Sequence, residues 1–459
     1  MPDSRSLAQR SRARRPTDSS LRKLAHSPSS AAALCLGVTA WGLFAAYLIW
    51  RVVEGPVLTW QDTTSYMAVA RHPFPSAALL GGARAPVEPL LWKLTGTETR
   101  YALTQTVIAI VAWSVLAATV AWRLRSPWRS LLAGVVVLSF ASTWQVIDWD
   151  WSVLSESISL SALALMFAAI LWLVQRVTLP RAVVFLLASL VYAGARDPGI
   201  WVVAMLAVIA CALALARLIA GGPRRAARTA LIGLALLSIA GVTELGAVSS
   251  NRNVINVEDV FDVRVFPFPQ RIAWFAARGM PQSAALDSLA ASARPNRKRA
   301  TVIAPHLGGR QWRALSTWFN RKSQVLYLEY LLTHPGYDVT APFVSPELTF
   351  NDANGNLAFY AGPYTPLPVI SAIMFPPGDV IAVLGLLSAS LAVARRLTRL
   401  TEIRAMVVMA IVGMLAILIA WQGDGMEVAR HTIEGNVEVR LAVLVTMLFA
   451  LLWSPRART

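Results

Sequence analysis

Charged residues able to do chemistry lie in four short stretches of this sequence. The first begins with Asp62 in the segment 62–66 and continues to Arg84 in the segment 84–91. Asp62 closely follows an apolar segment, so partial desolvation at a membrane surface would raise its pKa and make it a better general base. The alternative interpretation is a helix cap, because Asp62 precedes a helical pattern over 63–70 and Asp is a favoured N-cap residue.

The second stretch places three acids within nine residues. Asp148, Asp150 and Glu156 are accompanied by Trp149 and Trp151, which predicts a small polar site under an aromatic lid. The tryptophans could equally be interface anchors, and a glutamate at a helix N-terminus is favoured by the helix dipole alone. The acids of the first two stretches are hard oxygen ligands of the kind that Mg²⁺ or Mn²⁺ accepts. No spacing is diagnostic of a metal, so a divalent cation remains an open alternative.

The other two stretches carry arginine. Arg196 lies in a turn between two apolar segments, where its planar guanidinium suits a phosphate group; a pair with the neighbouring aspartate is the alternative. Glu427, Arg430 and His431 have the i, i+3, i+4 spacing of one helix face, and Asp424 precedes them. An arginine and a histidine beside acids predict a site for a phosphorylated substrate, whereas an internally satisfied surface cluster would bind nothing.

The elements that must position these stretches are apolar segments of membrane-spanning length. Ten can be read, near 31–50, 101–122, 130–145, 155–175, 182–195, 199–216, 229–249, 380–394, 405–421 and 440–453. If the N-terminus is cytoplasmic, the inner segments hold 22 Lys and Arg against 3 Asp and Glu, and the outer segments hold 20 against 22. This sorting obeys the positive-inside rule and places the four stretches on the outer face. The basic residues behind the net charge of +17 are then expected to contact lipid headgroups of the bilayer and not nucleic acid.

The predicted fold is an all-α polytopic membrane protein of the cell membrane, with about ten transmembrane helices and both termini cytoplasmic. It has a re-entrant or amphipathic first outer loop and a mixed outer segment of about 130 residues. The expected parts are a disordered basic tail at 1–30, a transmembrane catalytic core at 31–249 that includes the outer loop 51–100, an extracytoplasmic segment at 250–379, three further spans at 380–454 and a short tail at 455–459.

The large outer segment predicts helices followed by loop. Residues 269–279 form an amphipathic pattern closed by Gly279, and a longer helix is expected from Gly309 to His334. The longer helix carries an aromatic stripe that consists of Trp312, Leu315, Trp318, Phe319, Leu326, Tyr327 and Tyr330. This stripe predicts packing against the membrane domain or the bilayer, with a sugar-stacking platform as the alternative. Pro, Gly and Asn between 337 and 378 favour extended loop.

The arrangement of these motifs resembles the GT-C superfamily of multi-spanning glycosyltransferases. The resemblance rests on the acid at Asp62 in its Asp-x-x-Ser/Thr-Tyr setting and on the Arg-x-Pro-x-x-Pro-Leu-Leu stretch that begins at Arg84. Acids in the second outer loop and Arg196 also match the layout of the superfamily. The stretches 275–281 and 424–431 are similar to uncharacterised actinobacterial members.

The resemblance implies transfer of a sugar from a polyprenyl phosphate donor to an extracytoplasmic acceptor, with inversion at the anomeric carbon. It implies catalytic roles for Asp62, Asp148, Asp150 and Glu156, contact of the donor phosphate with Arg196, Arg430 and His431, and contact of the substrate with Tyr66, Arg84, Trp149, Asp424 and Glu427. We expect Asp62 to share one outer cavity with at least one acid of the second stretch. The rival interpretations are a carrier or flippase for lipid-linked glycans and a non-catalytic envelope assembly protein. A carrier would place ionisable residues near the middle of the bilayer, which only Glu244 approaches.

Overall fold

A computed structural model describes residues 28–124, 126–250, 252–293, 309–350, 367–425 and 427–453. The predicted tail at 455–459 and all but the last residues of the tail at 1–30 lie outside this part of the chain. The described residues form helices joined by short turns, with one isolated β-bridge between Leu58 and Ser152. The all-α prediction is therefore confirmed for the described residues.

Seven helices in the described residues are long and apolar enough to cross a membrane. They are α2 (Pro28–Glu54), α6 (Glu98–Trp122), α9 (Glu156–Leu173), α11 (Asp197–Ile219), α12 (Pro223–Ser249), α23 (Thr401–Gly423) and α25 (Ile433–Leu452). Two bent pairs raise this number to nine if each pair is one span. In the first pair α7 (Pro127–Ala141) meets residues 144–151 at 60°, and in the second α21 (Pro368–Met374) meets α22 (Gly378–Ala394) at 52°. The fifth predicted span corresponds to α10 (Leu179–Ala195), which has 17 residues and is shorter than each of the seven long helices. The structure thus supports a multi-pass membrane protein with seven to nine candidate spans.

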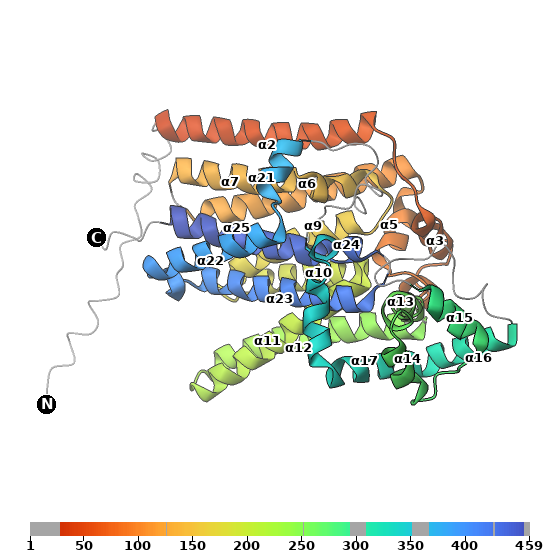
Figure 1. Cartoon of the computed structure of the whole chain (residues 1–459). Coiled ribbons are helices and arrows are strands. Elements are labelled where there is room, and N and C mark those ends of the chain that lie inside the picture. The colour runs from red at the N-terminus through yellow and green to blue at the C-terminus, as the bar shows by residue number, and fades with distance from the viewer. Residues whose placement is uncertain are drawn as a thin grey trace, which may run out of the picture.

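Consecutive long helices alternate in direction, so every second connection lies at the same end of the bundle (Figure 1). One end gathers the basic connections. Arg123 pairs there with Glu402, and the Arg395 guanidinium donates to the carbonyl oxygen of Trp453 at 2.7 Å. The opposite end carries the starts of α9, α11 and α25 together with the outer segments. The candidate residues found in the sequence therefore belong to this second end.

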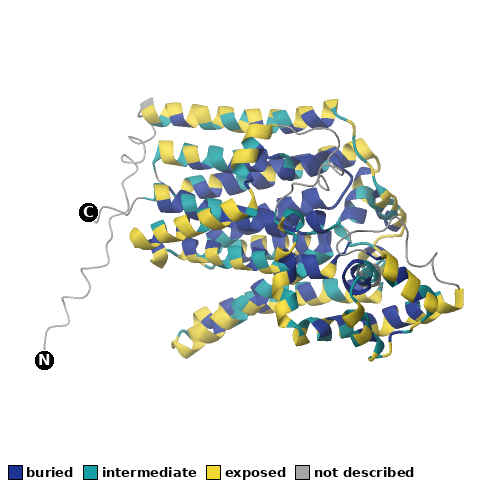
Figure 2. Ribbon diagram, in the orientation of Figure 1, coloured by how far each residue is buried: buried dark blue, intermediate teal, exposed yellow. Residues whose placement is uncertain are grey.

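The core of the bundle is built around α9 and α25. Of the residues in the most apolar 18-residue stretch of each helix, 78% are buried in α9 and 72% in α25. The corresponding share is 17% in α2, at the outside of the bundle (Figure 2). Helices α23 and α25 approach each other closely because glycines face the contact. A Cβ atom on Gly435 would lie 2.6 Å from Cγ1 of Ile417 and 2.7 Å from the carbonyl oxygen of Gly413.

Short helices cover the end that carries the candidate residues. The first outer loop contains α3 (Gln61–Ala70), α4 (Ala77–Leu80) and α5 (Val87–Thr95). After α7 the chain bends into α8 (Trp144–Ile147) and the 3₁₀ turn η1 (Asp148–Trp151). The Leu58 N–H donates to the Trp151 carbonyl at 2.9 Å, and the Val153 N–H donates to the Leu58 carbonyl at 2.9 Å. These bonds join the first outer loop to the second.

The described part of the large outer segment is helical. It contains α13 (Arg252–Val260), η2 (Phe261–Val265), α14 (Pro269–Ala276), α15 (Ala284–Ser292) and a continuous helical run made of α16 (Gly309–Trp318), η4 (Phe319–Ser323) and α17 (Gln324–Thr333). Gly279 adopts a φ of +89° just after α14, as its predicted role at a helix end requires. The helices predicted near 269–279 and from Gly309 onward are present in the described residues. Extended loop over 337–378 is wrong where the structure describes it, since α18 (Pro335–Thr340), α19 (Pro346–Thr349) and α21 are helices.

The aromatic stripe of the outer segment packs inside it. Leu315, Trp318 and Phe319 are buried, and Phe261 lies 5.2 Å from Phe319 and 5.5 Å from Trp318 between ring centroids. The Tyr327 hydroxyl also donates to Gln422 at the end of α23, at 2.9 Å. The stripe therefore forms a core and joins the outer segment to the membrane domain, and its buried rings present no platform for a sugar.

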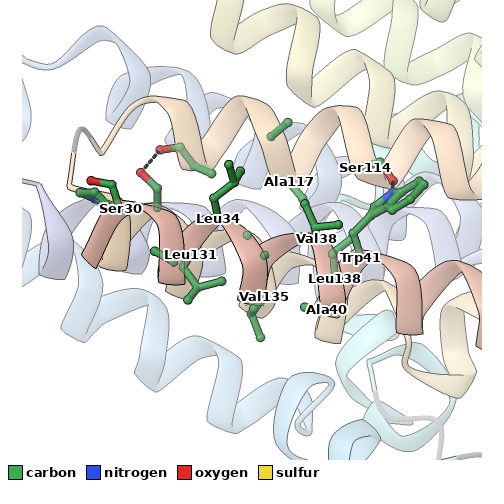
Figure 3. A pocket seen from close by; sticks show the side chains of 17 residues that line it. Ser30, Leu34, Val38, Ala40, Trp41, Ser114, Ala117, Leu131, Val135 and Leu138 are labelled. Carbon is green, nitrogen blue, oxygen red and sulfur yellow. Dashed lines mark hydrogen bonds between the residues drawn. The ribbon is translucent and has the colours of Figure 1, made fainter. Parts of the chain in front are cut away.

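An apolar cavity of about 610 Å³ lies between α2, α6 and α7 (Figure 3). Its lining is mainly small and aliphatic, and the Trp41 indole N–H donates to the Ser114 hydroxyl at 2.8 Å beside it. None of the candidate residues lines this cavity. Its walls are surfaces of membrane-spanning helices, so it has no part in positioning the charged residues.

Candidate functional site

Arg430 is the centre of a cluster of ion pairs at the outer end of the bundle. Its Nη2 lies 2.9 Å from Oδ2 of Asp62, its Nη1 lies 2.7 Å from Oε2 of Glu427, and its Nε contacts Oε1 of Glu156. Burial alone would lower the pKa of Arg430, but Glu156, Glu427 and Asp62 raise it well above its usual range. Arg430 therefore stays charged and joins three carboxylates from different parts of the chain.

A second buried arginine, Arg196, continues the cluster. Its Nη1 lies 2.5 Å from Oε1 of Glu434, and its Nη2 lies 3.3 Å from the same Glu156 oxygen that contacts Arg430. Its Nη2 also lies 3.4 Å from Nδ1 of His431. Glu156 is thus a carboxylate shared by two guanidinium groups, and it is fully buried. We call the set Asp62, Arg84, Glu156, Arg196, Asp424, Glu427, Arg430, His431 and Glu434 the ion cluster.

Local structure explains how three helix ends deliver these groups. Glu156 is the first residue of α9, where the helix dipole favours a negative charge. Arg196 lies between α10 and α11, so the turn holds its side chain at the bundle end. The short helix α24 (Val428–His431) connects α23 to α25 and pairs Glu427 with Arg430 at i, i+3. Glu427 contacts Arg430 and His431 as the i, i+3, i+4 spacing predicts, but it precedes the helix and its backbone is not helical.

Asp62 lies in the first turn of α3 with both carboxylate oxygens occupied. Oδ1 accepts from Nη2 of Arg84 at 2.6 Å, while Oδ2 faces Arg430. Asp62 does not cap the helix, since the N-cap is Trp60, whose N–H donates to the Thr63 hydroxyl at 2.9 Å. Burial raises the pKa of Asp62, but Arg430 and Arg84 more than offset this effect and lower the pKa below its usual value. The prediction that Asp62 would be a strengthened base is therefore wrong.

Arg84 and Tyr66 support this carboxylate. Arg84 also donates from Nε to the Ser65 hydroxyl at 2.6 Å, and its guanidinium lies 5.4 Å from the Tyr66 ring centroid. Tyr66 is buried, and desolvation raises the pKa of its hydroxyl above the usual value. Arg84 therefore holds Asp62 in place, and the Tyr66 ring lies beside the Arg84 guanidinium.

His431 and Asp424 complete the cluster on the α23–α25 connection. The His431 Nε2 lies 3.1 Å from Oδ2 of Asp424 and 3.8 Å from Oε2 of Glu427. The Glu427 N–H donates to Oδ1 of Asp424 at 3.2 Å. Asp424 therefore holds both the imidazole and the backbone of the connection that presents Arg430.

The cluster has a buried base and a partly exposed edge. Arg196 and Arg430 are each 5% exposed and Glu156 is not exposed, whereas the Asp62 side chain is 22% exposed and that of Glu427 is 26% exposed. His431 and Arg84 are also partly exposed. A ligand that approaches this end of the bundle would therefore meet Asp62, Arg84, Glu427 and His431 first.

The remaining candidates of the second stretch have structural contacts. Asp150 is buried, and its Oδ1 accepts from the Ser157 hydroxyl at 2.5 Å. The Gln105 side chain donates to three carbonyl oxygens of the η1 turn, including that of Asp150 at 2.7 Å. Asp148 is buried on the side of α2, near Tyr47. Asp148 and Asp150 therefore belong to a buried turn and not to the partly exposed edge of the ion cluster.

Trp149 is likewise neither an aromatic lid nor an interface anchor. Its side chain is 2% exposed within the main core, and its indole N–H donates to the Gln145 carbonyl at 3.0 Å. Trp151 is also buried, and the Arg51 guanidinium lies 4.4 Å from its ring centroid. The bend after α7 turns both rings inward, so the Trp149 ring lies in the core of the bundle.

Three buried acids were not predicted from the sequence, one in the ion cluster and two outside it. Glu434 pairs with Arg196, and Glu438 lies one turn further along α25. Glu88 lies within the stretch 84–91 and is fully buried, with the Tyr101 hydroxyl donating to it. Burial raises the pKa of Glu88 to about 8. The signal that could have found Glu434 and Glu438 is their i, i+4 spacing just before an apolar run, which places both on one helix face.

The described residues do not offer a ligand set for a divalent cation. No group of three or more His, Cys, Asp or Glu side chains among them has a metal-binding arrangement. The carboxylates proposed as ligands are divided, since Asp62 and Glu156 face Arg430 while Asp150 binds Ser157. We therefore derive no step through a metal.

Comparison of the chain with protein-family models, curated proteins and solved structures finds no match. The function is therefore inferred from the ion cluster itself.

Proposed function

We propose that this protein is a membrane glycosyltransferase that uses a polyprenyl-phosphate-linked sugar and an extracytoplasmic acceptor. The observation that carries the proposal is Asp62, a partly exposed carboxylate held by Arg84 and Arg430 at the accessible edge of a buried arginine cluster. A lipid donor reaches such a site from the bilayer, with its phosphate at the depth of the helix ends. The outer end of a helical bundle therefore suits this reaction.

In this proposal Asp62 orients the acceptor and stabilises the transition state. Its lowered pKa keeps it ionised at neutral pH but makes it a weak base. The acceptor hydroxyl would donate a hydrogen bond to Asp62 while its oxygen attacks the anomeric carbon. As the new C–O bond forms the hydroxyl becomes acidic, and its proton passes to Asp62, which releases it to water. The bond from that carbon to the phosphate oxygen breaks, and the phosphate takes the electron pair. Positive charge near the phosphate stabilises this departure.

In this proposal Arg430 and Arg196 are the cationic groups that contact the donor phosphate. Both are engaged by carboxylates, so the phosphate must replace one of these contacts. Glu427 is the best candidate to leave, because it is partly exposed and belongs to a short connection, while Glu156 is fully buried. Phosphate binding would thus replace the Glu427 carboxylate at Arg430 by the donor phosphate, and the guanidinium would remain paired with an anion.

The test compares Asp62→Asn with Asp287→Asn in purified protein given a polyprenyl-phosphate sugar. Asp287 lies on the exposed side of α15 in the outer segment and provides a matched control. We expect Asp62→Asn to lose at least about 10²-fold in transfer rate, the lower end of what a positioned acid–base or orienting group contributes. The thermal midpoint of each variant shows whether the fold persists. Full transfer by folded Asp62→Asn would refute the proposal.

A second candidate is a carrier for lipid-linked glycans, and one observation favours it. Glu434, Glu438 and Arg440 are buried inside the candidate span α25, whereas the sequence analysis began this span at residue 440. Ionisable residues inside a span mark transport or proton pathways by default. Movement of a fluorescent lipid-linked sugar across vesicles, unchanged in Asp62→Asn and without transfer to an acceptor, would support this function instead.

A further inference from the structure

Glu438 is a buried carboxyl group inside a membrane-spanning helix. It lies in the first half of α25 and has no exposed surface. Among the described residues neither of its carboxylate oxygens has a hydrogen-bond partner. This separates it from Glu434 one turn earlier, whose Oε1 contacts Arg196. The two acids share a helix face but not an environment.

The packing around Glu438 is specific. Gly413 of α23 faces its stem, since a Cβ atom on this glycine would lie 2.9 Å from Cγ of Glu438. Tyr192 of α10, itself buried, is close enough to interact electrostatically with both Glu438 and Glu434. Tyr192 and Glu434 are thus the titratable groups that face Glu438. Helices α7, α9, α22 and α23 also pack against α25, and their described residues give this carboxyl no ion pair.

The nearest arginines are used elsewhere. Arg440, two residues further along the chain, donates to the Asn436 side chain at 2.7 Å and to the carbonyl oxygens of Phe350 and Pro376. Arg196 is shared by Glu156 and Glu434. A carboxylate without a cation in a buried site carries a large desolvation cost, and a carboxyl group avoids that cost by keeping its proton.

We propose that Glu438 is a proton-binding site in the membrane-spanning part of the protein, protonated at neutral pH while its neighbour Glu434 is ionised by Arg196. On one face of α25, Glu434 is then a charged member of the ion cluster and Glu438, one turn further along, is a neutral acid. This assignment does not depend on whether the protein transfers or carries a sugar.

The test is infrared difference spectroscopy of the full-length protein in lipid vesicles at pH 7. Wild type minus Glu438→Gln should show the C=O stretch of one protonated carboxyl group, with a shift in D₂O. The matched control, Glu434→Gln, changes the same residue type one turn away and should instead remove carboxylate bands. Loss of carboxylate bands in Glu438→Gln, or of the protonated band in Glu434→Gln, would overturn the proposal.

A second variant keeps the test decisive if Glu438→Gln does not fold. Gln has the size of a neutral Glu, so we expect a thermal midpoint near that of wild type. Should that variant fail, Glu438→Asp retains an acid and should shift the protonated band within its own region. A change confined to the carboxylate region in Glu438→Asp would again overturn the assignment.

Discussion

Replacement of Arg430 by Gln tests whether the ion cluster holds the outer end together. The variant removes one positive charge that three carboxylates share. Asp62 keeps Arg84, and both Asp62 and Glu427 are partly exposed, so their share of the loss is at most about 1 kcal/mol each. Glu156 is fully buried and would keep only Arg196, at 3.3 Å. Breaking a buried pair typically costs ~3–5 kcal/mol, so the loss should come mainly from Glu156.

The double variant of Arg430 and Glu156 tests this contact directly. Glu156→Gln removes the buried charge, so Arg430→Gln combined with Glu156→Gln should be more stable than Arg430→Gln alone. The coupling energy should be about 1–3 kcal/mol, as for residues in one network. Denaturant unfolding in detergent micelles, followed by tryptophan fluorescence, measures each corner of the cycle. The Arg278→Gln variant is the control, since Arg278 and Glu329 form an exposed pair at 3.0 Å that should be worth about 1 kcal/mol or less.

Two results would refute the account. Additive effects of Arg430→Gln and Glu156→Gln would mean that the two residues do not depend on each other. A loss in Arg430→Gln no larger than in Arg278→Gln would mean that the buried pairs contribute no more than a surface pair.

Two further predictions concern a buried acid and a close helix contact. Burial raises the pKa of Glu88 to about 8, above an unfolded value of about 4.3, so its contribution to stability is present below pH ~4.3 and is lost as pH rises toward 8. Glu88→Gln should remove this pH dependence of the unfolding free energy, measured at pH 5 and 8. An unchanged pH dependence in the variant would contradict the prediction. Gly435→Ala should lower the free energy of unfolding by about 1–3 kcal/mol, because the added Cβ would overpack against Ile417. The control Gly385→Ala, whose Cβ would meet Val443 at an ordinary 3.5 Å, should be near neutral. Equal unfolding midpoints for the two variants would show that α23 and α25 can separate freely.

The sequence predicted the helices and the end of the bundle that holds the charged residues. Both can be read from short stretches of sequence, because the length of an apolar run and the basic residues of a connection do not depend on distant contacts. The sequence also identified the residues of the ion cluster other than Glu434, since Asp62, Glu156, Arg196 and Arg430 all lie at predicted helix mouths. It could not predict their partners. The contact between Arg430 and Glu156 spans 274 positions, and only the packing of α9 beside α25 makes it.

The errors have related physical causes. The pKa of Asp62 was misjudged because burial was counted without the two arginines that accompany it. Asp148 and Asp150 were assigned to the edge because a turn rich in Trp and Asp is typical of a membrane surface. The bend between α7 and α8 carries that turn inward, where Gln105 binds its carbonyls. The polar start of α25 was missed because Glu434 and Glu438 interrupt the apolar pattern that defines a span.

The charge balance of the ion cluster leads to a last prediction. Three arginines face five carboxylates, so an anionic donor phosphate competes with groups already present. If Glu427 is the group that yields, Glu427→Gln should tighten binding of a polyprenyl phosphate by up to about fivefold, equivalent to the ~1 kcal/mol of a partly exposed ion pair. Asp287→Asn should leave the affinity unchanged, and both can be measured by calorimetry in micelles. Weaker binding in folded Glu427→Gln would show that Glu427 supports the ligand, and would remove Arg430 as the phosphate contact.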